Sequence, residues 1–232
     1  MCIRDRPNGT NKTVATFLPL ISFGCVLTAG IYVPIAGYEF DVFPGDLMMV
    51  VVLLSVPSLA YFLNGWATGG GYSLIGANRS LLQYFSYEVP FLIAMAGAAW
   101  TSGSFQISEI VHYQNRSLSL ILIQPLGFLV GIIALLGKLK RNPFDIPKAK
   151  TEVVAGPLTE ISGERLALWH LILQIQAVVG VFLLVNVFLG KSYPNPFVNV
   201  LFFIGKSILL HVMLALVSVN YARTTISQFA NI

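Results

Sequence analysis

Six long apolar stretches are the feature of this sequence that most restricts its fold. They cover roughly residues 14–37, 47–64, 81–101, 118–137, 166–190 and 197–222. A helix needs about 20 mostly apolar residues to cross the hydrocarbon core of a bilayer. Irregular backbone exposed to lipid would leave peptide groups unpaired, and the sequence lacks the short alternating segments of a β-barrel. We therefore predict an all-α fold, a polytopic transmembrane helix bundle with about six spans.

The composition agrees with a membrane-embedded chain. Hydrophobic residues make up 56% of the 232 residues and charged residues only 10%. The mean hydropathy is +0.76. These values lie outside the usual range of soluble domains, so the lipid bilayer is an expected partner.

The distribution of basic residues predicts the orientation of the chain. With a cytoplasmic N-terminus, only Arg116 and Lys191 lie outside, and Lys206 falls within the last span. The inside then carries Arg4, Arg6, Lys12, Arg79, Lys138, Lys140, Arg141, Lys148, Lys150, Arg165 and Arg223. Such a bias follows the positive-inside rule. The net charge of +4 is thus interpreted as a topology signal, and no nucleic-acid partner is expected.

A polar loop at residues 138–165, KLKRNPFDIPKAKTEVVAGPLTEISGER, separates two of the predicted spans and holds ten charged residues. Its apolar residues (Ile146, Val153, Val154, Leu158 and Ile161) alternate with the charges, which predicts that the loop folds back against the helix ends. Clustered carboxylates such as Asp145, Glu152 and Glu160 are suited to carrying protons. The alternative for part of the charge is local ion pairing of Glu152 with Lys148 and Lys150.

Glu88 is an acidic residue within the third predicted span, in the segment LLQYFSYEVPFLIAMAG. A carboxylate at mid-bilayer costs about 3 kcal/mol or more unless it is paired, protonated or hydrated. Arg79 lies nine residues earlier, about 13 Å along a helix, so it is not an intrahelical partner. Two interpretations remain open: a protonated Glu88 bonded to a neighbouring helix, or a member of a proton or ion path.

The sequence contains no recognisable redox or metal centre. Cys2 and Cys25 are too few for a cluster, and His112, His170 and His211 are far apart. The histidines are interpreted as packed or interfacial polar residues. No cofactor is therefore expected to be bound by this chain alone.

The ends of the chain suggest a piece of a longer protein. The start, MCIRDRP, lacks the apolar core of a signal peptide, so residues 1–13 are interpreted as a non-native or fragment leader. Residues 14–230 are predicted to form a single transmembrane domain.

Three segments of the chain resemble one known family, and two of them are separate motifs that agree with it in order and topology. The run RNPFDIPKAKTEVVAGPLTEISG is similar to the signature loop of the complex I membrane subunit called H in bacteria and subunit 1 in mitochondria. The segment ANRSLLQYFSYEVP resembles a helix of the same NADH-quinone oxidoreductase subunit, and KSILLHVMLALVSVNYAR a later one. Membrane subunits of energy-converting group 4 [NiFe] hydrogenases share the loop. The resemblance covers about residues 14–228.

The resemblance implies roles for particular residues. In this family the matching positions form a proton path and coupling element, here Glu88, Asp145, Glu152 and Glu160. The positions at the quinone site or the interface with the peripheral arm are Arg79, Arg141, Pro143, Phe144 and Asp145. The family fold has about eight spans, so this piece would contain about six of them.

The resemblance also implies partners and a location. The expected partners are the iron–sulfur small subunit and large catalytic subunit of a peripheral arm, together with antiporter-like membrane subunits. A quinone would lie at the interface with those subunits. The expected location is the plasma membrane of a prokaryote, with loop 138–165 on the cytoplasmic side.

Three residues depart from the family pattern. Lys148 and Lys150 stand where the family commonly has glutamates, and Ile161 replaces a tyrosine. The two lysines invert local charges, which shifts the interpretation towards the hydrogenase branch or a divergent complex.

The sequence thus predicts a coupling subunit that links electron transfer in a partner arm to proton or sodium movement. A stand-alone secondary transporter with Glu88 as coupling site is one alternative, but internal repeats typical of transporters are not evident. A structural anchor, with the loop serving only as a docking surface, is the other. Replacing Glu88 by glutamine separates these hypotheses.

Overall fold

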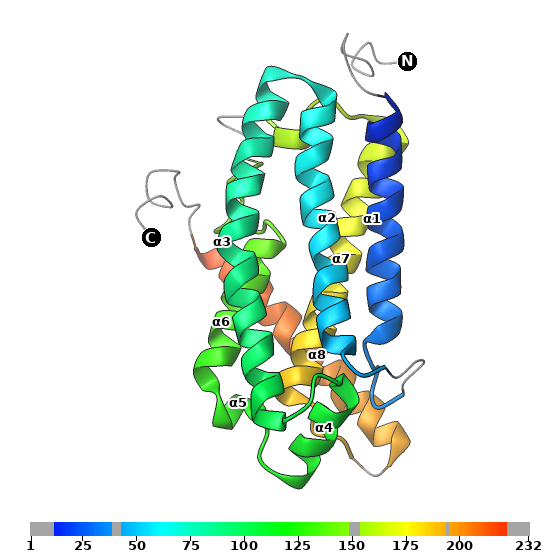
Figure 1. Cartoon of the computed structure of the whole chain (residues 1–232). Coiled ribbons are helices and arrows are strands. Elements are labelled where there is room, and N and C mark those ends of the chain that lie inside the picture. Colours follow the sequence, from blue (N-terminus) through cyan, green and yellow to red (C-terminus); the bar gives the residue numbers. More distant parts are fainter. Residues whose placement is uncertain (1–11, 39–42, 149–153, 194, 222–232) are drawn as a thin grey trace.

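The computed structural model describes residues 12–38, 43–148, 154–193 and 195–221 (Figure 1). The helices are α1 (Lys12–Tyr32), α2 (Asp46–Thr68), α3 (Gly71–Ser102), α4 (Ile107–Arg116), α5 (Leu120–Ile123), α6 (Pro125–Lys138), α7 (Gly163–Leu189) and α8 (Pro196–Asn220). A short 3₁₀ helix, η2 (Gly156–Leu158), precedes α7. The predicted leader falls almost entirely on residues 1–11, outside the described residues.

The predicted all-α membrane bundle is confirmed. Four helices combine the length and apolarity needed to cross a membrane: α2, α7, α8 and the Thr13–Tyr32 part of α1. Helix α3 is longer still, with 32 residues, but less apolar because it carries polar side chains such as Arg79 and Glu88. The chain is therefore a multi-pass membrane protein.

The predicted span at residues 118–137 is wrong as a continuous helix. The structure divides it into the four-residue α5 and the 14-residue α6. Gln124 between them has non-helical dihedrals (φ −130°, ψ 66°). The cause is Pro125, which offers no N–H and disfavours helical backbone in the residue before it. Helix α6 is about 21 Å long, which is shorter than the hydrocarbon core of about 30 Å.

Because α6 is short, it ends halfway along its neighbour α3. Its last residue, Lys138, contacts Glu88, which is the eighteenth of the 32 residues of α3. The chain then continues as an irregular segment between the helices, where Leu139, Lys140 and Ile146 are buried. Irregular backbone at this depth is tolerated where protein surrounds it. We call residues 139–162 the interhelical loop; residues 149–153 of it lie outside the described part.

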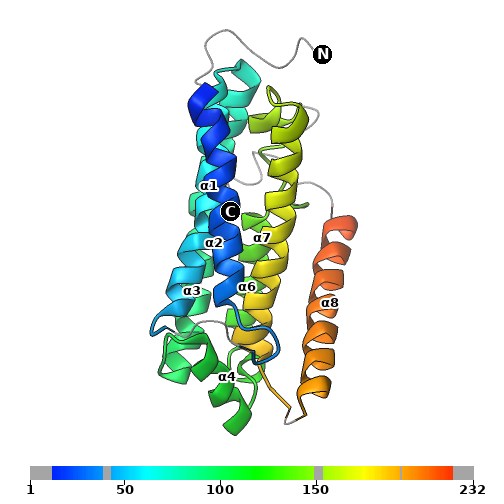
Figure 2. The same ribbon diagram turned by 90° about the vertical axis from the view of Figure 1, so that its right-hand side faces the viewer.

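The other long helices make up the rest of the bundle. Helix α1 packs on α2 and α7, and α3 packs on α2 and α6. The turn between α2 and α3 consists of Gly69 and Gly70, and the positive φ of Gly69 (71°) is one that glycine adopts without strain. Figure 2 shows α8 standing to one side of the bundle next to α7, where Phe203 meets Phe182 with ring centres 5.2 Å apart.

The far end of the bundle is closed by the amphipathic helix α4. Its buried Gln114 donates to the carbonyls of Asn186 (3.1 Å) and Val187 (2.9 Å) and accepts from the N–H of Gly190 (3.0 Å). These bonds satisfy backbone groups at the C-terminal end of α7. They fix α7, which forms one wall of the site described next.

Candidate functional site

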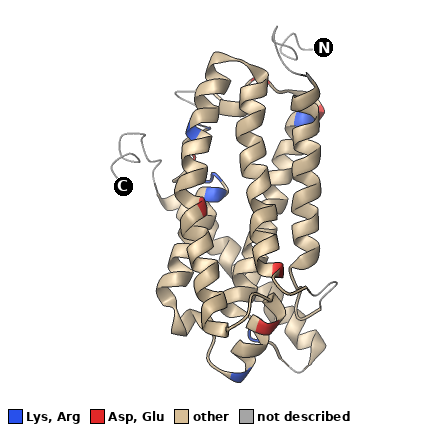
Figure 3. Ribbon diagram, viewed as in Figure 1, with Lys and Arg blue, Asp and Glu red and all other residues tan. Residues whose placement is uncertain are grey.

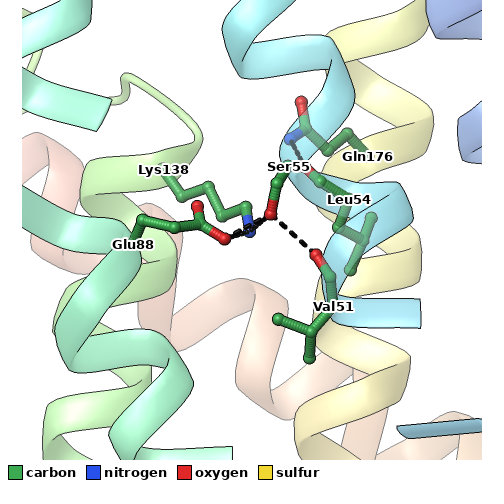
Figure 4. Close-up of polar contacts among 6 residues, drawn as sticks. All are labelled: Val51, Leu54, Ser55, Glu88, Lys138 and Gln176. Carbon is green, nitrogen blue, oxygen red and sulfur yellow. Dashed lines mark hydrogen bonds and ion pairs between the residues drawn. The ribbon is translucent and has the colours of Figure 1, made fainter. Parts of the chain in front are cut away.

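The centre of the bundle holds an ion pair between α3 and α6. Figure 3 shows how sparse other charges are along the bundle at this level. The Nζ atom of Lys138 lies 3.0 Å from Oε1 of Glu88, and the side chains are only 2% and 9% exposed (Figure 4). Two charges withdrawn from water are tolerated together because each compensates the other. Glu88 is therefore a paired residue in this structure.

Helix α2 contributes a hydroxyl group that contacts both members of the ion pair. Ser55 Oγ accepts from Nζ of Lys138 at 3.0 Å and contacts Oε1 of Glu88. Its single proton can go to Glu88 or to the carbonyl of Val51, 2.8 Å away. At the same level Gln176 of α7 donates to the carbonyl of Leu54 (2.9 Å). Side chains from α2, α3 and α6 thus meet at the carboxylate of Glu88, and α7 supports α2 at this level.

Lys138 is the member of the ion pair for which the sequence alone predicts no role in the site. Its place directly after an apolar run assigns it to the polar loop instead of the bundle interior. The available signal is its position as the first charge after a segment broken by Pro125. A broken helix of that length cannot carry its end to the membrane surface, so its terminal charge needs an internal partner.

A second set of contacts attaches the interhelical loop to α3. The Nε2 atom of Gln83 donates to the carbonyls of Gly137 (2.7 Å) and Phe144 (2.6 Å). The rings of Tyr87 and Phe144 have centres 5.0 Å apart, and the Tyr87 ring packs directly on Gly137. The loop and the last turn of α6 are therefore held by the same helix, α3, that carries Glu88.

Two further lysines lie around a buried tyrosine. Nζ of Lys140 is 4.8 Å, and Nζ of Lys148 5.8 Å, from the centre of the Tyr61 ring. Burial lowers the pKa of Lys140 to about 7, assisted by repulsion from Lys148 and Lys138, while Glu88 acts in the opposite direction. Burial also lowers the pKa of Lys148, against the attraction of Asp145. These groups change charge more readily than exposed lysines do.

The second half of the loop is seated on α2 and α3 by small residues. A Cβ atom on Gly76 would lie 2.6 Å from Cα of Gly156, and one on Gly65 would lie 2.8 Å from Cβ of Pro157. The Pro157 carbonyl also accepts from Oγ of Ser73 at 3.4 Å. The prediction that the loop folds back against the helices is confirmed for its described residues.

The structure places the predicted site residues in different regions. Near the ion pair, Pro143 is buried, Phe144 packs on Tyr87, and Asp145 interacts with Lys148. Arg141 donates to Oε1 of Gln174 on α7 at 3.0 Å.

The remaining predicted residues lie elsewhere. Arg79 is half-buried on α3, two to three turns before Glu88. Glu160 lies against Gly70 at the start of α3, about 27 Å along the helix from Glu88. Glu152 lies outside the described residues, as does Lys150. Because Glu152 is the middle acid of the predicted string, the string of Asp145, Glu152 and Glu160 stays a prediction.

The described residues contain no group of three or more His, Cys, Asp or Glu side chains that could hold a metal ion. Several buried polar atoms have no hydrogen-bond partner there, including Ser58 Oγ, Tyr61 OH, Ser80 Oγ, Gln83 Oε1 and Glu88 Oε2. Such atoms commonly bond to internal water. The fold and this interior define a polytopic membrane protein with an ionisable, polar centre between its helices.

Comparison with known proteins places the chain more narrowly. Residues 5–232 match the family model of NADH dehydrogenase, and the chain belongs to this family. It is 32% identical over 195 residues to the H subunit of NADH-quinone oxidoreductase from Carboxydothermus hydrogenoformans, covering 82% of this chain and 54% of the relative. It is 31% identical over 224 residues to the protein of the same name from Dehalococcoides mccartyi strain CBDB1, covering 96% and 63%. The chain thus spans between half and two thirds of the length of these curated relatives.

A solved structure agrees with the fold. A chain of the membrane-bound sulfane sulfur reductase, an archaeal respiratory membrane complex, superposes with a TM-score of 0.87 at 27% sequence identity. The match covers 97% of this chain and 76% of the other. The similar proteins are thus subunits of multi-subunit membrane complexes.

Proposed function

We propose that this chain is the membrane-arm coupling subunit of an NADH-quinone oxidoreductase-like complex. It links electron transfer in a peripheral arm, with a quinone near the interhelical loop, to translocation of protons or sodium ions. The observation that carries the proposal is the buried Glu88–Lys138 pair, which lies at the middle of α3 and is joined to the loop. An ionisable residue inside a membrane bundle is by default a candidate functional residue, and ion pathways are among the roles of such residues.

The contacts provide a route for the coupling. A displacement of Phe144 by the peripheral arm would pull on Gln83, which also holds the carbonyl of Gly137. Gly137 precedes Lys138, so movement of the last turn of α6 changes the distance between Lys138 and Glu88. Loosening the pair would leave Glu88 ready to take up a proton or a sodium ion.

The proposed partners follow from the family. An iron–sulfur small subunit and a large catalytic subunit would dock at the loop. Antiporter-like subunits would respond to the change in the charge or pairing of Glu88. The distribution of basic residues supports a cytoplasmic loop in a prokaryotic plasma membrane. We assign to the part of the chain on which the arm would act the residues Asp145, Glu152, Glu160, Arg79, Arg141, Pro143 and Phe144.

A second candidate is the same coupling role with another catalytic arm. The similarity to a chain of a sulfane sulfur reductase favours it, as do the lysines that replace acidic residues in the loop. A membrane-bound [NiFe] hydrogenase is the alternative predicted from the sequence. Mass spectrometry of the native, full-length complex would separate these arms by the subunits and metal ligands that co-purify.

The function is tested by replacing Glu88 with glutamine in the native complex. We expect the number of ions moved per electron in vesicles to fall more than tenfold. The reason is that the glutamine amide, unlike the carboxyl group of Glu88, neither binds nor releases a proton near neutral pH. Less complex should assemble, because Lys138 loses its carboxylate, but some should still form, since glutamine keeps the shape and can still bond to Ser55. Counting ions per electron transferred corrects for the smaller amount of complex.

The matched control is Glu109→Gln, which neutralises an exposed carboxylate on α4. It should leave translocation unchanged. If Glu88→Gln also leaves it unchanged in an assembled, electron-transferring complex, the chain is a structural anchor and the proposed function is wrong.

A further inference from the structure

Lys140 is a buried lysine that forms no ion pair with a carboxylate within the residues that the structure describes. It is 4% exposed, and its ammonium group lies over the Tyr61 ring at 4.8 Å. Among the described residues it is Lys138, not Lys140, that forms the ion pair with Glu88. An aromatic ring stabilises a buried cation less than a carboxylate does. The charge on Lys140 is therefore the least compensated among the buried lysines in the described part of the chain.

Lys140 nevertheless lies next to the ion pair. Its side chain, Lys138 and Glu88 line the same gap, which has essentially no free volume. No solute fits between them, so these charges act on each other directly. Glu88 attracts Lys140, while Lys138 repels it.

Glu88 has one oxygen available for a second cation. Its Oε1 atom contacts Lys138 and Ser55, whereas the buried Oε2 atom has no hydrogen-bond partner within the ranges that the structure describes. A protonated Lys140 can therefore compete with Lys138 for the same carboxylate.

The charged and titratable groups around Lys140 come from three helices and the loop. They are Tyr61 on α2, Tyr84, Tyr87 and Glu88 on α3, Lys138 at the end of α6, and Arg141, Asp145 and Lys148 in the loop. Asp145 interacts with Lys148, and Lys148 shares the Tyr61 ring with Lys140. A shift of the loop thus changes the field at Lys140.

We propose that Lys140 is a positioning residue whose protonation controls the pairing of Glu88 with Lys138. The proposal rests on the coupling function proposed above. When the amine of Lys140 binds one proton through its lone pair, the new ammonium attracts Glu88 and repels Lys138, and the ion pair loosens. When that proton leaves to water on the loop side, the pair closes again.

In this proposal the group that transmits a change from the loop to Glu88 is a lysine, Lys140, and not a carboxylate of the loop. It gives a role to Lys140, which lies over Tyr61 beside Lys148 and lines the same gap as Lys138 and Glu88. It also gives the loop an electrostatic means of acting on Glu88, in addition to the Gln83 contact.

The test compares Lys140→Met and Lys140→Arg with the wild type in the native, full-length complex in vesicles. The measurement is the ratio of ions moved to electrons transferred between about pH 6 and pH 9. We expect the wild-type ratio to change by about threefold or more around the pKa of Lys140, which is about 7. Both variants should give a flat profile in this range, because methionine is always neutral and arginine always charged. Lys191→Met, at an exposed position outside the site, is the control and should keep the wild-type profile.

A structural role for Lys140 predicts a different result. The variants would then lower the ratio at every pH and retain the inflection, and this outcome would overturn the proposal. If Lys140→Met fails to assemble, Lys140→Arg decides alone, since it keeps the cation and the apolar stem. Loss of translocation in Glu88→Gln combined with an unchanged profile in the Lys140 variants would reject the switch and retain the coupling function.

Discussion

Lys138→Met is expected to lower the free energy of unfolding by about 3–5 kcal/mol, because it leaves Glu88 buried without its cation. Lys138 and Glu88 are almost fully excluded from solvent, and the nearest remaining polar group is the Ser55 hydroxyl. Methionine fills a similar volume, so the loss reports charge compensation rather than packing. The measurement is a denaturant or thermal unfolding curve of the full-length protein in mild detergent.

The double variant Glu88→Gln, Lys138→Met separates this effect from a general defect in the core. Removing both charges also removes the uncompensated carboxylate, so the double variant should lose less than about 1.5 kcal/mol. If the free energy of unfolding of Lys138→Met alone lies within about 1 kcal/mol of the wild-type value, the two side chains do not form an ion pair in the folded protein.

Gly76→Ala is expected to lower the free energy of unfolding by about 1–3 kcal/mol and to detach the second half of the interhelical loop. The added Cβ would lie 2.6 Å from Cα of Gly156 and 2.8 Å from Cδ of Pro157. Both are backbone or ring atoms that cannot rotate away, so η2 must move as a unit. Limited proteolysis should show faster cleavage in the loop, and hydrogen exchange should increase around Pro157.

Gly71→Ala is the matched control in the same helix. A Cβ atom there meets nothing within 4 Å, and alanine favours helical structure over glycine by up to about 1 kcal/mol. Stability should therefore stay the same or rise. Equal losses in both variants would show that the close approach of η2 to α3 is not what holds the loop.

The extent of the helices follows closely from the sequence. The predicted spans at 47–64, 166–190 and 197–222 agree with α2, α7 and α8 to within a few residues. Long apolar runs specify membrane helices because the peptide hydrogen bonds form within each run, without help from distant residues. The resemblance carried by the loop and by the segment ANRSLLQYFSYEVP also names the correct family.

The third helix begins earlier than predicted. Residues 71–80 lie outside the predicted span because they are polar, yet they belong to α3 and seat η2 at Gly76. The importance of Glu88 and Asp145 remains a prediction. The structure adds to it the side chains of Lys138, Lys140 and Tyr61, for which the sequence alone predicts no role in the site.

The sequence by itself determined that this protein is an all-α membrane bundle, where most of its spans lie, and to which family it belongs. These properties depend on local composition and on short motifs. Only the tertiary structure decided that Glu88 pairs with Lys138 and that two lysines of the loop lie over Tyr61. The reason is that Pro125 shortens α6 and the packing of α6 on α3 sets the level at which it ends. That level, and the partner it gives Glu88, depends on contacts between residues 50 positions apart.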